Sequence, residues 1–216
     1  MGGLIFKQAW RDFTTTPTTA GPSPGIREQW HRGRRWYAVW VLRVSEAAVH
    51  ERMAEVADRL GDAVRVIPAD QAHITLFVSG FPTPNPHLDD DIAESALLRQ
   101  RDALAAADLR LDLTIGGACS FSTAAFLEVH EGGGLTAIRR ILAGQADELR
   151  FTDYHPHVTV GVYRDTAPIP PLVAALTPLR DLPPIPLSPT AVELVVFDAT
   201  IEGSALVTRY AVPMSR

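Results

Sequence analysis

Two short stretches of this sequence share one pattern, a histidine and a threonine two residues apart at the start of an apolar, strand-like run. They are HITLFV at His73–Val78 and HVTVGV at His157–Val162. Successive side chains of a strand point to opposite faces, so each histidine shares a face with its threonine while the residues between them face a core. The pattern predicts two strands whose polar faces can be brought opposite one another.

The paired histidines are suited to acid-base chemistry near neutral pH. An imidazole has an unperturbed pKa of about 6.5, so one ring can take a proton from water while the other returns a proton to a departing alkoxide. Threonine hydroxyls can donate to the non-bridging oxygens of a phosphate, whose charge grows in the transition state. The pattern therefore predicts cleavage of a phosphodiester without a metal, with a catalytic set of His73, Thr75, His157 and Thr159.

A single His-x-Thr also occurs in ordinary strands, where histidine is half exposed and threonine is simply a good strand former. The repetition favours a function, because both copies begin apolar runs and both follow polar or proline-containing turns. Two other functions stay open. One is a metal-dependent hydrolase using His155 and His157, although no third ligand has suitable spacing. The other is a non-catalytic module that binds nucleotides or RNA ends.

The two motifs and the order of segments around them resemble the two-histidine (2H) phosphoesterase superfamily, in particular its branch of 2'-5' RNA ligases and RNA 2',3'-cyclic phosphodiesterases. The similarity covers most of the chain, with an opening strand at 35–41, an approach to the first motif at 64–68, a middle hairpin at 121–129 and closing strands at 191–214. It implies an α+β fold of two pseudo-symmetric lobes, each an antiparallel sheet backed by helices, with a central cleft.

The resemblance also implies an activity, the opening of 2',3'-cyclic phosphates to 2'-phosphates, and some members join RNA ends through a 2'-5' linkage. Carried over to this chain, His73 protonates the leaving 3' oxygen and His157 activates water, while Thr75 and Thr159 hold the phosphate. No cofactor and no metal are implied. The expected partner is an RNA 3' end or a small cyclic nucleotide.

This chain departs from the family pattern at two positions. Many members carry a basic residue where this chain has Phe77, and an arginine where it has Val162. By strand parity, Arg164 can share the side of Val162 if the strand continues, and His155 shares that of the second motif histidine. Either can supply the missing positive charge. The expected substrate-binding residues are His155, Arg164, Phe77 and Tyr154.

Composition agrees with this interpretation. The 216 residues are 46% hydrophobic and carry a formal net charge of -5, which argues against a protein that coats long nucleic acids but not against one that binds a single terminal phosphate. Cys119 is the only cysteine, which excludes an internal disulfide. No apolar run has the length of a membrane span or the form of a signal peptide, so we expect a cytoplasmic monomer without a membrane partner.

Residues 1–33 differ in composition from the rest, with Thr/Pro-rich and Gly/Pro-rich stretches. We expect an irregular N-terminal arm over 1–33 and a 2H phosphoesterase domain of two lobes over 34–216. The alternative is that Trp10, Phe13 and Trp30 tether the arm across the body or the cleft. Apolar spacing also predicts helices over 46–60, behind the first lobe, and over 92–107 and 135–149.

Overall fold

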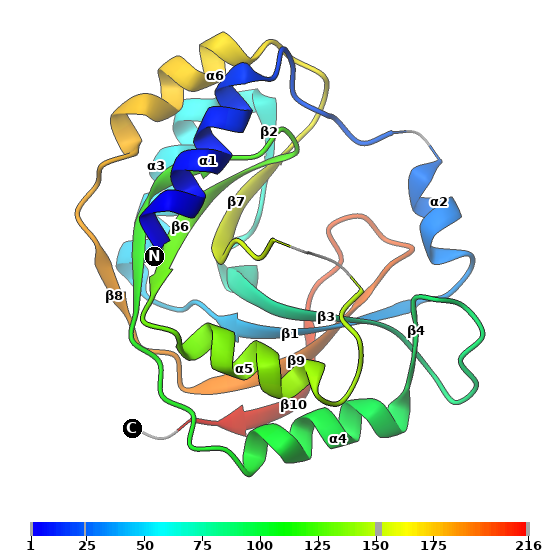
Figure 1. Cartoon of the computed structure of the whole chain (residues 1–216). Helices are drawn as coiled ribbons and strands as arrows, with labels where there is room; N and C mark the ends of the chain where they lie inside the picture. Colours follow the sequence, from blue (N-terminus) through cyan, green and yellow to red (C-terminus); the bar gives the residue numbers. More distant parts are fainter. Residues whose placement is uncertain (1, 24, 150–152, 215–216) are drawn as a thin grey trace.

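A computed structural model describes residues 2–23, 25–149 and 153–214 (Figure 1). Short 3₁₀ turns occur at Gly61–Ala63, Ala69–Gln71 and Thr177–Leu179. In chain order the helices and strands are α1 (Gly2–Thr15), α2 (Ile26–His31), β1 (Trp36–Arg43), α3 (Ala47–Leu60), β2 (Val64–Val66), β3 (His73–Thr83), β4 (Asp91–Ala93), α4 (Glu94–Ala105), β5 (Leu113–Ser120), β6 (Ala124–Glu131), α5 (Gly134–Ala143), β7 (His157–Tyr163), α6 (Ile169–Leu176), β8 (Ile185–Leu187), β9 (Ala191–Asp198) and β10 (Val207–Pro213).

The strands form one large sheet in the order β10-β9-β1-β3-β7-β6-β5-β8, with β2 added beside β7 and β4 beside β3. Apart from the parallel β3–β4 pair, every strand pairing among the described residues is antiparallel. The two halves of the sheet meet where β3 pairs with β7, and each half brings one His-x-Thr strand to this seam. The α+β fold, an antiparallel sheet backed by helices, is confirmed.

Helices α3, α4 and α5 pack against the sheet, but not each against the half that precedes it in the chain, and α6 packs on α3. Helix α3 contacts β7 and β2, and α5 contacts β3. The expectation that residues 46–60 back the first half is therefore wrong. The reason is the chain path: α3 leads into β2, which pairs with β7 of the second half, so the apolar stripe of the helix is buried there.

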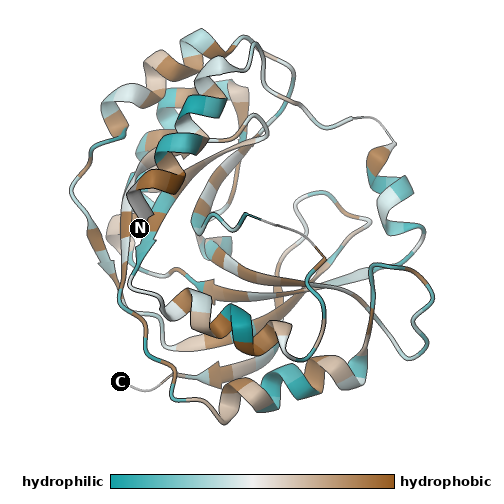
Figure 2. Ribbon diagram, in the orientation of Figure 1, coloured by the Kyte–Doolittle hydropathy of each residue, from teal (hydrophilic) through white to brown (hydrophobic). Residues whose placement is uncertain are grey.

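The core between the sheet and the helices is apolar. Figure 2 shows hydrophobic residues along the central strands of the sheet. One polar network crosses the core. The indole Nε1 of the fully buried Trp40 donates to Gln100 Oε1 at 2.8 Å, and Gln100 Nε2 donates to the carbonyl of Leu142 at 3.3 Å. Because these residues belong to β1, α4 and α5, the network fixes the position of two helices on the first half of the sheet.

The N-terminal segment differs from the expected irregular arm, because it contains α1 and α2; residues 1 and 24 lie outside the described part. Phe6 and Phe13 are each 1% exposed, and α1 contacts β5 and β6. The ring of Phe13 stacks on Tyr163 at 6.4 Å. Phe6, Phe13 and Ala9 between them form an apolar stripe at helical spacing, and its burial outweighs the weak helix propensity of the flanking residues.

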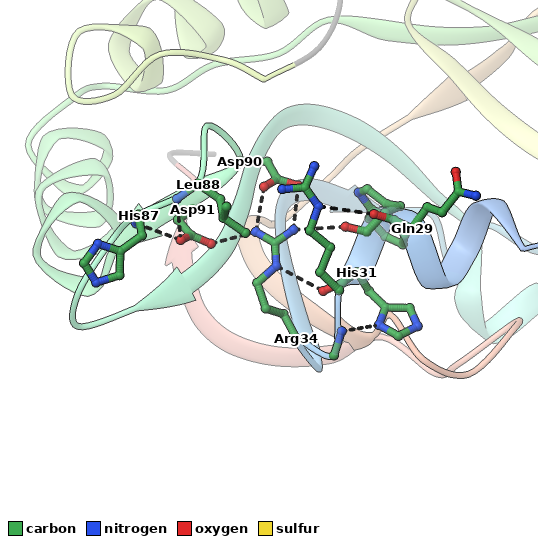
Figure 3. Close-up of polar contacts among 10 residues, drawn as sticks. Gln29, His31, Arg34, His87, Leu88, Asp90 and Asp91 are labelled. Carbon is green, nitrogen blue, oxygen red and sulfur yellow. Dashed lines mark hydrogen bonds and ion pairs between the residues drawn. The ribbon is translucent and has the colours of Figure 1, made fainter.

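Helix α2 is fixed to the other half of the sheet by Arg34 (Figure 3). Its guanidinium forms ion pairs with Asp90 at 2.6 Å and Asp91 at 2.7 Å, and donates to the carbonyls of Trp30 and His31. Two charged groups thus hold the end of α2 against the segment that leads into β4. The helix has a fixed place at the edge of the sheet.

Candidate functional site

The face of the sheet opposite α3–α6 contains a cavity of about 590 Å³ that is lined from both halves. His73, Thr75 and His157 are among its lining residues, as are the sequence-predicted His155 and Tyr154. Helix α2 contributes Arg27 and Trp30 to the wall, and the segment after β9 contributes Ile201, Gly203, Ser204 and Leu206. The cavity is therefore bounded by the seam of the sheet, α2 and the β9–β10 loop.

The seam sets the relation between the two motifs. Ile74 of β3 and Val158 of β7 are antiparallel partners, and both side chains are fully buried. Extending this register by one residue in each direction places His73 opposite Thr159 and Thr75 opposite His157. Cross-strand partners have Cβ atoms about 4.5–5.5 Å apart, so the register predicts one compact group of two imidazoles and two hydroxyls.

Both motif histidines are oriented in the same way. The Nδ1 atom of His73 lies 2.7 Å from the carbonyl oxygen of Gln71, and that of His157 lies 2.6 Å from the carbonyl oxygen of His155. A carbonyl oxygen only accepts, so each Nδ1 carries a proton and each Nε2 is the basic nitrogen of the neutral ring. Among the residues that the structure describes, neither Nε2 has a hydrogen-bond partner.

The environment lowers the pKa of both imidazoles. The pKa of His157 falls to about 4, chiefly because of burial, with smaller contributions from the charge of a protonated His73 or His155. Burial also lowers the pKa of His73, with a smaller contribution from the positive charge of Arg43. The electrostatic interaction between His73 and His157 means that one ring resists protonation when the other carries a proton.

A β-bulge changes the strand parity after each motif. In β3, Thr75 pairs with Val41 and Phe77 pairs with Trp40, so Leu76 is an extra residue. Phe77 is consequently fully buried in the main core, while Val78 lines the cavity in its place. Uninterrupted alternation would place Phe77 on the same face as Thr75, at the substrate-binding site. The bulge turns Phe77 to the opposite face, so this expectation is wrong.

The second motif has an equivalent bulge. Thr159 pairs with Phe126 and Gly161 pairs with Ala125, which leaves Val160 as the extra residue. Val162 therefore returns to the face of the motif and lines the cavity. Thr159 lies on the same face, half-buried beside its partner Phe126, but is not one of the residues that line the cavity.

Two side chains bond the backbone of β3 at its bulge. The Tyr154 hydroxyl donates to the carbonyl of Thr75 at 2.9 Å, and Arg139 donates to the carbonyl of Leu76 at 2.6 Å. The Arg139 guanidinium also lies over the Tyr154 ring, 3.8 Å from its centroid, and binds both carboxylate oxygens of Glu148. Burial raises the pKa of Tyr154, so its hydroxyl stays protonated and remains a donor.

The two residues expected to supply positive charge have different places. His155 lines the cavity, and its ring lies edge-on to Phe121 at 5.7 Å. Arg164 is exposed beyond the end of β7 and does not line the cavity. Its Nε donates to the carbonyl of Val64 at 3.2 Å. Alternation predicted Arg164 on the cavity side only if the strand of the second motif continued through it. That strand, β7, ends at Tyr163.

The sequence reasoning missed three arginines that line the cavity, which are Arg27, Arg65 and Arg139. The alternative that Trp30 tethers the N-terminal arm across the cleft agrees with its place in the cavity wall, where its ring lies 4.8 Å from Tyr37 and 6.3 Å from Phe197. The alternation of Val64, Arg65 and Val66 was a usable signal for one arginine, since it predicts a polar side chain on the face opposite Val64. No expectation from the sequence placed Arg27 or Arg139 at the cavity.

No group of three or more histidine, cysteine, aspartate or glutamate side chains suited to a metal ion occurs in the described part of the chain. None of the helices that the structure describes combines the length and the apolar character needed for a membrane span.

Comparisons with known proteins agree with this fold. A family model described as the 2'-5' RNA ligase superfamily matches residues 40–200. The structure of Escherichia coli LigT complexed with 3'-AMP has a TM-score of 0.60 and 14% identity, covering 84% of this chain and 99% of that chain. The protein TT0787 of Thermus thermophilus also has a TM-score of 0.60, with 12% identity over 82% of this chain and 97% of that chain.

A third structure, E. coli LigT complexed with ATP, has a TM-score of 0.58 and 16% identity, covering 84% of this chain and 99% of that chain. A search of curated proteins by sequence found no match. At these identities the structural likeness establishes the fold, while the match over residues 40–200 establishes the family.

Proposed function

This chain belongs to the 2'-5' RNA ligase superfamily, and from that premise we propose that it is a metal-independent phosphodiesterase that opens 2',3'-cyclic phosphates on RNA ends or nucleotides. The observation that carries the proposal is the matched pair of imidazoles. Each has its Nδ1 held by a carbonyl two residues earlier, which leaves each Nε2 available for proton transfer in one cavity.

The difference in environment supports separate roles for the two rings. A general base has to be neutral, and His157, with a pKa of about 4, is neutral over most of the pH range. A general acid has to carry a proton. A bound phosphate anion favours the protonated form of a neighbouring imidazole, and His73 is the ring proposed to hold that proton.

In the proposed reaction, His157 Nε2 accepts a proton from water as the water oxygen bonds to phosphorus. The bond between phosphorus and the 3' oxygen breaks, and His73 Nε2 donates its proton to that oxygen, which leaves a 2'-phosphate. The Thr75 hydroxyl in the cavity lining donates to one non-bridging oxygen. Thr159, on the same strand face as His157 but outside that lining, is proposed to donate to another. A 5'-hydroxyl in place of water gives a 2'-5' linkage by the same transfers.

The nucleotide complexes of LigT support a small nucleotide as ligand, because the related fold binds 3'-AMP and ATP. The aromatic side chains Trp30 and Phe197 in the cavity wall offer apolar surface for the nucleoside part. A cavity of about 590 Å³ has the volume typical of small-molecule sites.

The test is a turnover assay on nucleoside 2',3'-cyclic phosphates, with products identified by phosphorus NMR and excess chelator in a parallel reaction. We expect a 2'-phosphate product at the same rate with and without chelator. A 3'-phosphate product, or loss of activity with chelator, contradicts the mechanism. Binding of the cyclic phosphate without turnover assigns the chain to the alternative, a non-catalytic module for nucleotides or RNA ends.

A further inference from the structure

We infer that Arg65 of β2 is the cation that binds the phosphate oxygens of the substrate. The inference rests on the proposed function, since it names a binding residue for the same cavity. Among the described residues, the cavity lining contains three arginines, and they differ in how far their charge is already used.

Strand register places Arg65 on the catalytic face. Strand β2 pairs antiparallel with β7, and Arg65 is the partner of Val162. Cross-strand partners project from the same face of a sheet, and both residues line the cavity. Because of the bulge at Val160, this is also the face of His157 and Thr159. Arg65 therefore projects beside Val162, the position at which many members of the family carry an arginine.

The other two arginines are less available to a ligand. The Arg139 side chain is 16% exposed and holds both carboxylate oxygens of Glu148 at 2.9 Å and 2.6 Å, so its charge is neutralised by a carboxylate that is itself only 14% exposed. Arg27 belongs to α2 rather than to the seam, and its Nη1 donates to the carbonyl of Ala199 at 3.3 Å. Both make contacts that hold the cavity walls together.

Arg65 is paired only weakly by comparison. Its Nη2 lies 3.1 Å from Glu202 Oε1, and the Glu202 side chain is 51% exposed on the β9–β10 loop. Ion pairs with a solvent-exposed carboxylate contribute little free energy, whereas arginine binds a phosphate through parallel, charge-assisted hydrogen bonds. A phosphate that enters the cavity can therefore replace Glu202 as the partner of Arg65.

The β9–β10 loop approaches the guanidinium closely at Gly203. A Cβ atom built on Gly203 would lie 3.0 Å from Arg65 Nη1, and the residue has a φ of +69°. A glycine at this position permits both the backbone conformation and the close approach. The loop thus holds the guanidinium at the cavity wall through Glu202 while no substrate is bound.

The experiment measures kcat and KM on a nucleoside 2',3'-cyclic phosphate, and separately the binding of inorganic phosphate by calorimetry, for the full chain. We expect Arg65→Gln to raise KM and to weaken phosphate binding about tenfold or more, with a smaller change in kcat. The matched control is Arg59→Gln, an exposed α3 arginine that does not line the cavity, and it should change neither value.

Glu202→Gln is a second test that does not depend on the folding of Arg65→Gln. Removal of the competing carboxylate should tighten phosphate binding severalfold, and unchanged or weaker binding overturns the inference. Values for Arg65→Gln within twofold of wild type also overturn it, as does a loss seen with Arg164→Gln instead. Failure of the wild-type chain to turn over substrate contradicts the proposed function alone, because phosphate binding still tests Arg65.

Discussion

The hydroxyl of Tyr154 donates a hydrogen bond of 2.9 Å to the backbone carbonyl of Thr75. Tyr154 stands in the turn just before the second motif, and Thr75 belongs to the first motif, so one bond connects the two motifs across the seam of the sheet. It is made at the β-bulge, where the strand ladder of β3 is interrupted. We regard Tyr154 as a positioning residue rather than a substrate ligand.

Tyr154→Phe should therefore lower kcat by about threefold to tenfold with little change in KM, because the Thr75 hydroxyl loses its fixed position. The control is Tyr210→Phe, since the hydroxyl of Tyr210 in β10 has no hydrogen-bond partner within the described residues. Steady-state kinetics on both variants check this. An increase in KM at constant kcat would instead indicate that Tyr154 contacts the substrate, as the sequence interpretation held.

The dependence of the rate on pH follows from the lowered pKa values of the two imidazoles. His157 has to be neutral to act as a base, so kcat/KM should fall as the pH drops below about 4. His73 has to be protonated to act as an acid, so kcat/KM should also fall as the pH rises above its pKa, which is lower than the ordinary value. The profile of the free enzyme is thus bell-shaped, with its maximum at acidic pH.

The profile of kcat should have its maximum at higher pH than that of kcat/KM, because a bound phosphate anion raises the pKa of the protonated imidazole. Measurements of both parameters across the pH range test this. A rate that rises continuously into the alkaline range would fit attack by hydroxide and would contradict acid catalysis by His73.

The buried amide of Gln100 offers a stability prediction. Gln100→Leu removes the acceptor that the indole nitrogen of Trp40 and the hydroxyl of Ser79 share in the core. An unsatisfied buried polar group costs about 1–3 kcal/mol, so the free energy of unfolding should fall by at least that amount. Denaturant titration measures it. Gln8→Leu, on the exposed side of α1, should change it by less than about 0.5 kcal/mol.

Helix α1 offers a second stability prediction. Phe13 is 1% exposed and stacks on Tyr163, so Phe13→Ala should cost about 3–5 kcal/mol of unfolding free energy. Leu4→Ala is the matched control, because Leu4 is 80% exposed. Thermal unfolding of both variants checks the difference. Equal stability of the two variants would mean that α1 does not dock on β5 and β6 in solution.

Alternation of side chains was enough to predict from the sequence that His73 shares a face with Thr75, and both line the cavity. The same rule failed at Phe77, because simple alternation does not allow for a β-bulge. Whether a strand forms a bulge depends on the strand with which it pairs. Arg65 was missed for a related reason. Its place at the site follows from the pairing of the three-residue strand β2 with β7, and a pairing between distant segments is not encoded locally.

The N-terminal helices show a similar limit. Threonine, proline and glycine around residues 14–25 predict irregular structure, but the stripe that includes Phe6 and Phe13 becomes helical by packing on the sheet. Trp30 reaches the cavity wall because Arg34 fixes the end of α2 to Asp90 and Asp91. Both outcomes depend on tertiary contacts rather than on local propensity.

The most direct test of the account is the turnover rate of His73→Ala and His157→Ala on a nucleoside 2',3'-cyclic phosphate, with thermal unfolding as the control for folding. The account predicts that each change lowers kcat by a factor on the order of 100 or more, and that the double variant loses less than the product of the two. Retention of most of the wild-type kcat in folded samples of both variants would contradict acid-base catalysis by the two histidines.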